Sequence, residues 1–254
     1  MNPIKHIPNF ITSLNVLAGC LSIVASVEGF PVLASLLILV AAVFDFFDGF
    51  FARLLKAYSD IGKELDSLAD VISFGVAPAF ILYNLIKSVL CINDISFDTI
   101  TNTEILILAS PFLLVVFSAL RLAKFNVDTR QTSSFIGLPT PANAILIASL
   151  PMIMAYTGSM KYFFIFLNLK FLLPLIFIQC FLLVSPIPMF ALKFKNLAFK
   201  ENLIRYIFLI LVIALIVAFN IVAMPLIILL YVILSIINAM VCKFFCKKHK
   251  IEVI

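Results

Sequence analysis

The chain has 254 residues, of which 64% are hydrophobic and 12% charged, and its mean hydropathy is +1.21. A water-soluble domain of this length would not carry so much apolar surface, so the composition predicts a polytopic membrane protein and excludes an ordinary soluble domain. The net charge of +5 at pH 7 follows the expected topology, as described below, and does not indicate a nucleic-acid partner.

Apolar segments, taken in chain order, predict an all-α bundle of about eight transmembrane helices. Only helices and closed barrels satisfy their backbone groups in lipid, and apolar runs of about twenty residues are typical of helices. The expected spans are residues 10–27, 31–54, 65–90, 104–124, 139–157, 163–184, 203–220 and 222–242. Six or seven spans would result if 10–27 or 163–184 were partly interfacial. We expect one domain over residues 1–254, with a core at about 8–184, additional helices at about 203–242 and no cleavable signal peptide.

Basic residues gather in alternate connections between these spans. Of the 18 lysines and arginines, all but Lys87, Lys161 and Lys170 fall on the side that also holds both chain termini. The positive-inside rule therefore predicts cytoplasmic termini, in a bacterial or archaeal-type cytoplasmic membrane. The lysine-rich C-terminal tail is expected to contact anionic lipids of the inner leaflet.

Four aspartates lie in or beside the apolar sequence at the cytoplasmic ends of the second and third spans: Asp45, Asp48, Asp66 and Asp70. Ionisable residues within a membrane are costly and mark functional sites. The first two aspartates are three residues apart and the last two are four apart, so each pair shares one face of a helix. Ser59 and Asp60 are candidate caps for a helix starting near Gly62, and the short connection should make the two helices antiparallel, so that their acidic faces meet.

Carboxylate oxygens at such a site suit hard cations, Mg²⁺ or Mn²⁺, with Ca²⁺ as a substitute in a crystal. The chain has only two histidines, which argues against zinc. An alternative is that the carboxylates lie at the membrane interface and pair with Arg53, Lys56 and Lys63. Four carboxylates at helical spacing favour the metal site.

The pattern Asp45-x2-Asp48-Gly49-x2-Ala52-Arg53-x8-Gly62-x3-Asp66-x3-Asp70 resembles the signature of the CDP-alcohol phosphatidyltransferase family at every fixed position. The resemblance implies transfer of a phosphatidyl group from a CDP-linked donor to an alcohol, with release of CMP. It implies that the four aspartates hold two divalent cations and that Asp70 also takes the proton of the attacking hydroxyl. It further implies that Gly49, Ala52 and Gly62 let the nucleotide approach closely and that Arg53 lies near the donor.

The start of the first span is a second, weaker part of the resemblance. Pro8-Asn9-Phe10-Ile11-Thr12-x2-Asn15 is similar to the family's first-span sequence, and Asn9, Thr12 and Asn15 could face the nucleotide from one side of a helix. A helix cap followed by a polar interfacial turn is an equally simple interpretation.

The acceptor is predicted from the sequence after the third aspartate. Ser73-Phe74-Gly75-Val76-Ala77-Pro78 is similar to the phosphatidylserine synthase branch, whereas Ser67 and Val71 replace the proline and lysine usual in the glycerophosphate-using branch. Two later segments, Arg121-Leu122-Ala123-Lys124-Phe125-Asn126 and Gly137-Leu138-Pro139-Thr140-Pro141-Ala142-Asn143, also resemble the serine branch. The substrates implied are CDP-diacylglycerol and L-serine, and a homodimer is usual for the family.

L-Serine carries a carboxylate, which needs a cation in a site of low dielectric constant. Arg121 is the first candidate and Lys124 the second, with Asn126, Thr140 and Asn143 as neutral hydrogen-bonding partners. As alternatives, the two cations could be topological anchors, and the prolines at 139–141 could simply start a helix. Rival functions are the same chemistry on inositol, glycerol 3-phosphate or choline, a cation transporter, and a lipid-binding scaffold without activity.

Overall fold

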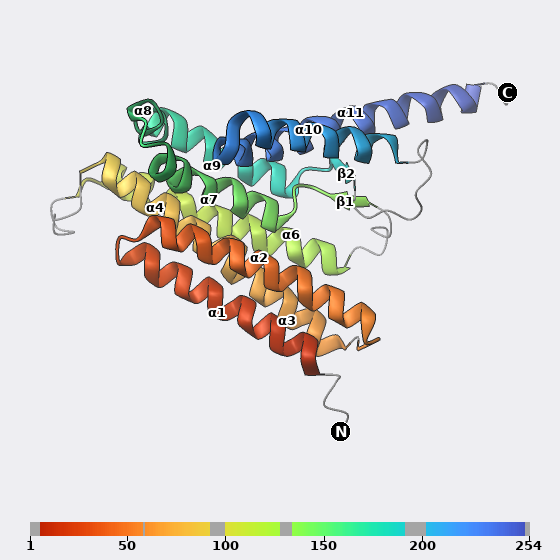
Figure 1. Cartoon of the computed structure of the whole chain (residues 1–254), viewed down its shortest axis with the longest axis horizontal. Coiled ribbons are helices and arrows are strands. Elements are labelled where there is room, and N and C mark those ends of the chain that lie inside the picture. Colours follow the sequence, from red (N-terminus) through yellow and green to blue (C-terminus); the bar gives the residue numbers. More distant parts are fainter. Residues whose placement is uncertain (1–5, 58, 92–99, 128–133, 191–201, 252–254) are drawn as a thin grey trace.

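The computed structural model describes residues 6–57, 59–91, 100–127, 134–190 and 202–251, which form one helical bundle (Figure 1). The predicted all-α membrane architecture is confirmed. Within those ranges, six helical stretches are long and apolar enough to cross a membrane, and a bent pair with 59° between its helices makes a seventh.

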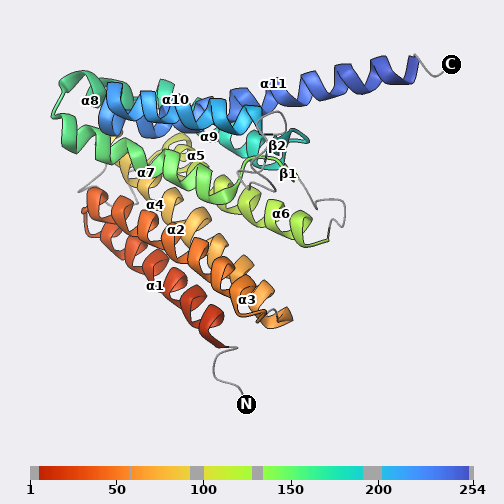
Figure 2. The same cartoon turned by 45° about the vertical axis from the view of Figure 1, so that its right-hand side comes forward.

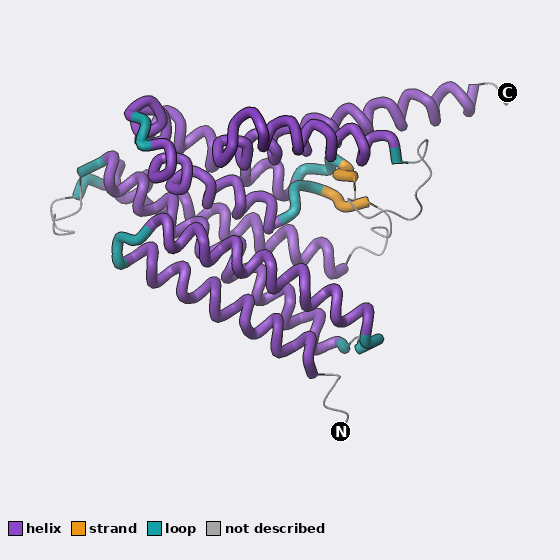
Figure 3. Tube along the Cα trace, viewed as in Figure 1, coloured by secondary structure: helices purple, strands orange, loops and turns teal. Residues whose placement is uncertain are grey.

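The helices, in chain order, are α1 (Ile7–Val27), α2 (Pro31–Leu54), α3 (Asp60–Asp70), the π-helix η2 (Val71–Val76), α4 (Ala77–Val89), α5 (Asn102–Ala109), the 3-10 turn η4 (Ser110–Phe112), α6 (Leu113–Val127), α7 (Thr140–Thr157), α8 (Met160–Phe166), α9 (Leu169–Val184), α10 (Leu203–Phe219), the 3-10 turn η5 (Asn220–Val222) and α11 (Ala223–Ile251). Two short strands, β1 (Ser134–Ile136) and β2 (Pro188–Phe190), complete the described elements and stand out in orange in Figure 3.

The last two predicted spans form a hairpin. The apolar stretch Leu203–Val241 is continuous in composition but is interrupted at Asn220, whose backbone has φ 48° and ψ −124°. The chain reverses there, and α10 and α11 lie side by side (Figures 1 and 2). The single membrane-crossing stretch therefore corresponds to two of the eight predicted spans.

The core lies between α1, α2, α4, α7 and α9. Ile38, Ile81 and Ile147 are almost completely buried there, together with the ring of Phe74 from the π-helix. The outer faces expose large apolar side chains such as Phe46 and Leu106, as expected where lipid is the solvent.

The third predicted span contains an unpredicted π-helix. The Ser73 hydroxyl donates to the backbone oxygen of Asn15 at 2.9 Å, and Gly19, one turn later on α1, faces the same serine. A β-carbon on Gly19 would lie only 2.9 Å from the Ser73 Cα, so only glycine allows this approach. The widened turn directly follows Asp70 and therefore lies beside a functional candidate, as π-turns often do.

A two-stranded ribbon, also unpredicted, fixes the start of α7. β1 and β2 are antiparallel, with Ser134 paired to Phe190 and Ile136 to Pro188. The Gly137 N–H donates to the Ile187 oxygen at 2.9 Å, directly before the Leu-Pro-Thr sequence that begins the helix. The ribbon thus ties the N-terminal end of α7 to the segment that follows α9.

Candidate active site

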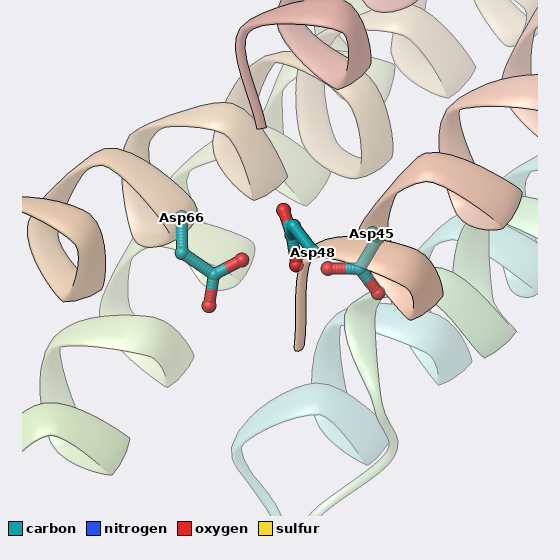
Figure 4. A group of neighbouring side chains, drawn as sticks. All are labelled: Asp45, Asp48 and Asp66. Atoms are coloured by element: carbon teal, nitrogen blue, oxygen red, sulfur yellow. The ribbon is translucent and has the colours of Figure 1, made fainter. Parts of the chain in front are cut away.

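Three carboxylates converge from the C-terminal half of α2 and from the middle of α3. Asp45 and Asp48 come from α2 and Asp66 from α3, and one oxygen atom from each lies within 4.8 Å of the others (Figure 4). Asp48 is buried, with 6% of its surface exposed, and the other two are half-buried. The predicted meeting of the two acidic faces is confirmed for these three residues.

The turn between α2 and α3 makes this convergence possible. Lys56 adopts a left-handed conformation with φ 50°, and the Ala57 N–H donates to the Ala52 oxygen at 3.0 Å, which gives the bond pattern of a Schellman C-cap. The Ser59 side chain then accepts from the Gly62 N–H at 3.0 Å, which confirms it as the N-cap of α3. After this reversal the chain returns toward α2, so that Asp66 of α3 meets Asp45 and Asp48.

Three carboxylate oxygens, two in the cluster and one on the neighbouring Asp70, are buried without a hydrogen-bond donor. They are Asp48 Oδ2, Asp66 Oδ1 and Asp70 Oδ1. Buried anionic oxygens without partners are strongly destabilising, and a divalent cation would supply the missing charge. Oxygen-only ligands in this arrangement fit Mg²⁺ or Mn²⁺, so the cluster can hold a divalent cation.

Asp70 occupies a separate position, one helical turn after Asp66. The Thr140 hydroxyl, at the start of α7, donates to Asp70 Oδ2 at 3.2 Å. Asp45, Asp66 and Arg121 are all close enough to Asp70 for their charges to act on its carboxylate. Its second oxygen, Oδ1, is the buried atom without a partner.

A pocket of about 450 Å³ adjoins the cluster. Its walls come from α1, α2, the α2–α3 turn, α3 and α6, and its lining residues are Pro8, Asn9, Thr12, Asp48, Gly49, Ala52, Arg53, Ala57, Ser59, Gly62, Lys63, Asp66 and Phe125. A β-carbon on Gly62 would lie 2.9 Å from the side-chain oxygens of Asn9 and Ser59, and one on Gly49 would meet only open space. Glycine at both positions therefore keeps the pocket wide.

Six of the seven residues predicted to contact a nucleotide line this pocket: Asn9, Thr12, Gly49, Ala52, Arg53 and Gly62. Asn15 does not line it. Its side chain is fully buried, with neither amide atom hydrogen-bonded, and its backbone oxygen accepts from Ser73.

The residues predicted to bind the acceptor lie in three places. Arg121 is buried close to Asp70, with its Nε lacking a hydrogen-bond partner. Thr140 contacts Asp70 directly, and Asn143 lies one turn further along α7, fully buried with both amide atoms unpaired. Lys124 is exposed, and the Asn126 side chain donates to Ser67 Oγ of α3 at 2.8 Å.

The pattern that defines the CDP-alcohol phosphatidyltransferases matches residues 5–182, which contain every residue of the carboxylate cluster and of the pocket. The chain belongs to the CDP-alcohol phosphatidyltransferase family. This family membership confirms the resemblance inferred from the aspartate signature.

Three relatives of this phosphatidyltransferase-family chain extend the comparison. The CDP-diacylglycerol–serine O-phosphatidyltransferase of Helicobacter pylori is 38% identical over 149 residues, covering 58% of this chain and 57% of the relative. The enzyme of the same name from Methanocaldococcus jannaschii is 38% identical over 141 residues, covering 56% and 58%. The archaetidylserine synthase of Methanothermobacter thermautotrophicus is 39% identical over 145 residues, covering 56% of each chain. The chain therefore spans little more than half the length of these relatives.

Five pocket residues of this family member were not predicted as site residues, namely Pro8, Ala57, Ser59, Lys63 and Phe125. Lys63 lies next to Gly62 on α3, and Phe125 lies one turn after Arg121 on the same face of α6. The spacing from Arg121 to Phe125 could have indicated a shared face. The closeness of α6 to α3 could not have been inferred from local sequence.

Proposed function

We propose that this phosphatidyltransferase-family chain transfers a phosphatidyl group from CDP-diacylglycerol to L-serine, giving phosphatidylserine and CMP. One observation carries the proposal: Asp70 has an unpartnered buried oxygen, and its carboxylate feels the charges both of the acidic cluster and of the buried Arg121. The names of the relatives, two CDP-diacylglycerol–serine O-phosphatidyltransferases and an archaetidylserine synthase, agree with this choice of acceptor.

The donor would bind with its pyrophosphate at the carboxylates and its nucleoside in the pocket. Asp45, Asp48, Asp66 and Asp70 would hold two divalent cations, Mg²⁺ or Mn²⁺, which neutralise charge on the pyrophosphate and on the departing CMP. Asn9, Thr12 and Arg53 line the adjoining pocket, where they can donate hydrogen bonds to the nucleotide. Gly49, Ala52 and Gly62 leave room for it.

In the chemical step, the serine hydroxyl oxygen attacks the phosphorus atom that bears diacylglycerol. A new oxygen–phosphorus bond forms, the bond from that phosphorus to the bridging pyrophosphate oxygen breaks, and CMP leaves with the bridging oxygen. Asp70 takes the hydroxyl proton on Oδ1, while the Thr140 hydroxyl holds Oδ2 and so sets the direction of the carboxylate.

Arg121 is the cation that would receive the serine carboxylate. It is 8% exposed, and its Nε is free to donate. Asn143 carries a second unpaired donor and acceptor on the Thr140 face of α7. Unpaired buried polar groups of this kind are explained by a polar ligand that completes their hydrogen bonds. Lys124 and Asn126 stay as predicted contributors, although the exposed Lys124 and the Ser67-bound Asn126 are less directly placed.

The site would face the cytosol. The start of α1, the α2–α3 turn and the C-terminal end of α6 lie at one end of the bundle (Figures 1 and 2). Arg53, Lys56 and Lys63 lie at that end, which the positive-inside rule assigns to the cytoplasm. Contacts of the basic C-terminal tail with anionic lipids, and a homodimer, stay predictions.

The test is a CMP-release assay on purified protein with CDP-diacylglycerol, L-serine and Mn²⁺ or Mg²⁺. Release should depend on serine, and Asp70→Asn should abolish it. Asp60→Asn is a matched control, since Asp60 is an exposed carboxylate on the same helix outside the pocket. Release driven by inositol, glycerol 3-phosphate or choline instead would overturn the acceptor assignment. Cation flux into liposomes without CMP release would favour a transporter.

A further inference from the structure

The buried Arg121 lies near Asp70 without donating a hydrogen bond to the free oxygen of that carboxylate. Its charge acts on Asp70, yet Oδ1 has no partner and Oδ2 accepts from Thr140. A guanidinium and a carboxylate that share a site of low dielectric constant attract each other strongly. A polar group that attracts Arg121 from another element would counter the pull of Asp70.

Tyr231 of α11 is such a group. Arg121 and Tyr231 are close enough for each to act on the ionisation of the other, and their exposed fractions are only 8% and 7%. The two side chains come from α6 and α11, and the β1–β2 ribbon is seen between these helices in both views (Figures 1 and 2). Tyr231 also lies outside residues 5–182, the range that the family pattern matches.

The phenol group of Tyr231 is fixed by its own contacts. Its hydroxyl donates to the Phe190 backbone oxygen at 3.1 Å, and Ser235, one turn further along α11, lies close to the same hydroxyl. The ring packs against Phe190 and Phe208, with centroid distances of 5.0 and 5.9 Å. Because its proton is given to Phe190, the phenol oxygen presents its partial negative charge to its other neighbours, which include the Arg121 guanidinium.

We infer that Tyr231 is a positioning residue of the acceptor site, whose fixed phenol oxygen keeps Arg121 from pairing with Asp70 and leaves the guanidinium available to the serine carboxylate. This inference rests on the proposed function, because it takes Arg121 as the cation that receives the acceptor. Tyr231 acts through Arg121 and does not itself contact serine. The C-terminal hairpin then contributes to acceptor binding through one side chain.

Steady-state CMP release by Tyr231→Phe tests the inference. The variant keeps the ring against Phe190 and Phe208 but removes the phenol oxygen, so Arg121 can turn toward Asp70 and serine must compete for the guanidinium. We expect the serine KM to rise about three- to tenfold, the effect of one lost hydrogen bond. The kcat at saturating serine and the KM for CDP-diacylglycerol should stay within about twofold, because bound serine recaptures the guanidinium.

A matched control and a double-mutant cycle accompany this variant. Tyr83→Phe removes a phenol from a half-buried ring on α4, outside the pocket, and should leave both KM values unchanged. Arg121→Lys should raise the serine KM by itself, because it removes the planar fork that binds a carboxylate. Tyr231→Phe should then add little in the Arg121→Lys background, and fully additive effects would overturn the positioning role.

The remaining outcomes separate this inference from the proposed function. A lower kcat with an unchanged serine KM would show that Tyr231 only supports the β1–β2 ribbon and would overturn the inference. If the unaltered chain depends on serine and Tyr231→Phe changes neither kcat nor KM, the inference alone falls. If CMP release by the unaltered chain does not depend on serine, the acceptor assignment and the inference fall together.

Discussion

The hydrogen bond from Thr140 to Asp70 makes a quantitative prediction about the proposed base. Thr140 is fully buried, and its hydroxyl lies 3.2 Å from Asp70 Oδ2. Thr140→Val keeps the β-branched shape and the packing of the first turn of α7 but removes the donor. The carboxylate then loses the contact that sets its direction, so Oδ1 no longer points consistently at the attacking hydroxyl.

A hydrogen bond to a charged group contributes about 1.5–3 kcal/mol, and the length of this one places it at the lower end of that range. If most of that energy serves to orient the base in the transition state, kcat should fall by about ten- to thirtyfold. The KM values for serine and CDP-diacylglycerol should change little, because neither substrate loses a contact. The measurement is steady-state CMP release at saturating metal.

Thr140→Ser is the control, since it restores the hydroxyl with one methyl group fewer. It should recover most of the lost kcat. A valine variant with an unchanged kcat would refute the orienting role. A valine variant that instead raises the serine KM with kcat unchanged would place the threonine in the acceptor pocket.

Three further variants test the scaffold and the metal site. Gly19→Ala should lower the free energy of unfolding by about 1–3 kcal/mol, measured by thermal unfolding in detergent, because the new methyl group overlaps Ser73. Gly137→Ala should also lower the free energy of unfolding by about 1–3 kcal/mol, because the backbone φ of 76° disfavours a β-carbon. The new methyl group would meet the Leu183 oxygen and displace the start of α7, so kcat should fall as well. Asp48→Asn should raise the Kd for Mn²⁺, measured by calorimetry, more than about tenfold, because replacing even a residue that only contacts a metal ligand weakens metal binding by that much. An unaltered Mn²⁺ affinity would exclude this carboxylate as a ligand.

The carboxylate cluster could be predicted because it depends on local geometry. Helical spacing alone places Asp45 with Asp48, and a short connection between two apolar segments brings Asp66 to them. What the sequence did not indicate was the means of the reversal. The reversal depends on Lys56, whose backbone adopts the left-handed conformation at a position where glycine is usual.

Features that depend on contacts between distant segments could not be predicted. The π-helix after Asp70 arises where Ser73 meets Gly19 of α1, and a single-sequence pattern does not report that approach. The contact of Asn126 with Ser67 joins residues 59 positions apart, so local pattern could place Asn126 on a helix without identifying its partner. The β1–β2 ribbon pairs short segments on either side of three helices and has no distinct periodicity of its own.

The site has two parts that are held by different segments of the chain: the carboxylate cluster with its pocket, and Thr140 at the start of α7. The carboxylate cluster and the adjoining pocket are built from α1, α2, α3 and α6, all within residues 5–182, the range shared with the family. Thr140, by contrast, follows Gly137 and Leu138, whose N–H groups donate to Ile187 and Leu182 at 2.9 Å.

The support of Thr140 therefore continues beyond the shared range. Ile187 precedes β2, and the β2 residue Phe190 packs against Phe208 of α10 and Tyr231 of α11, with the Tyr231 hydroxyl donating to its backbone oxygen at 3.1 Å. The C-terminal hairpin thus supports the start of α7, which carries the partner of the proposed base. Changes in these later segments are therefore expected to act first on the start of α7 and on the proposed acceptor half of the site.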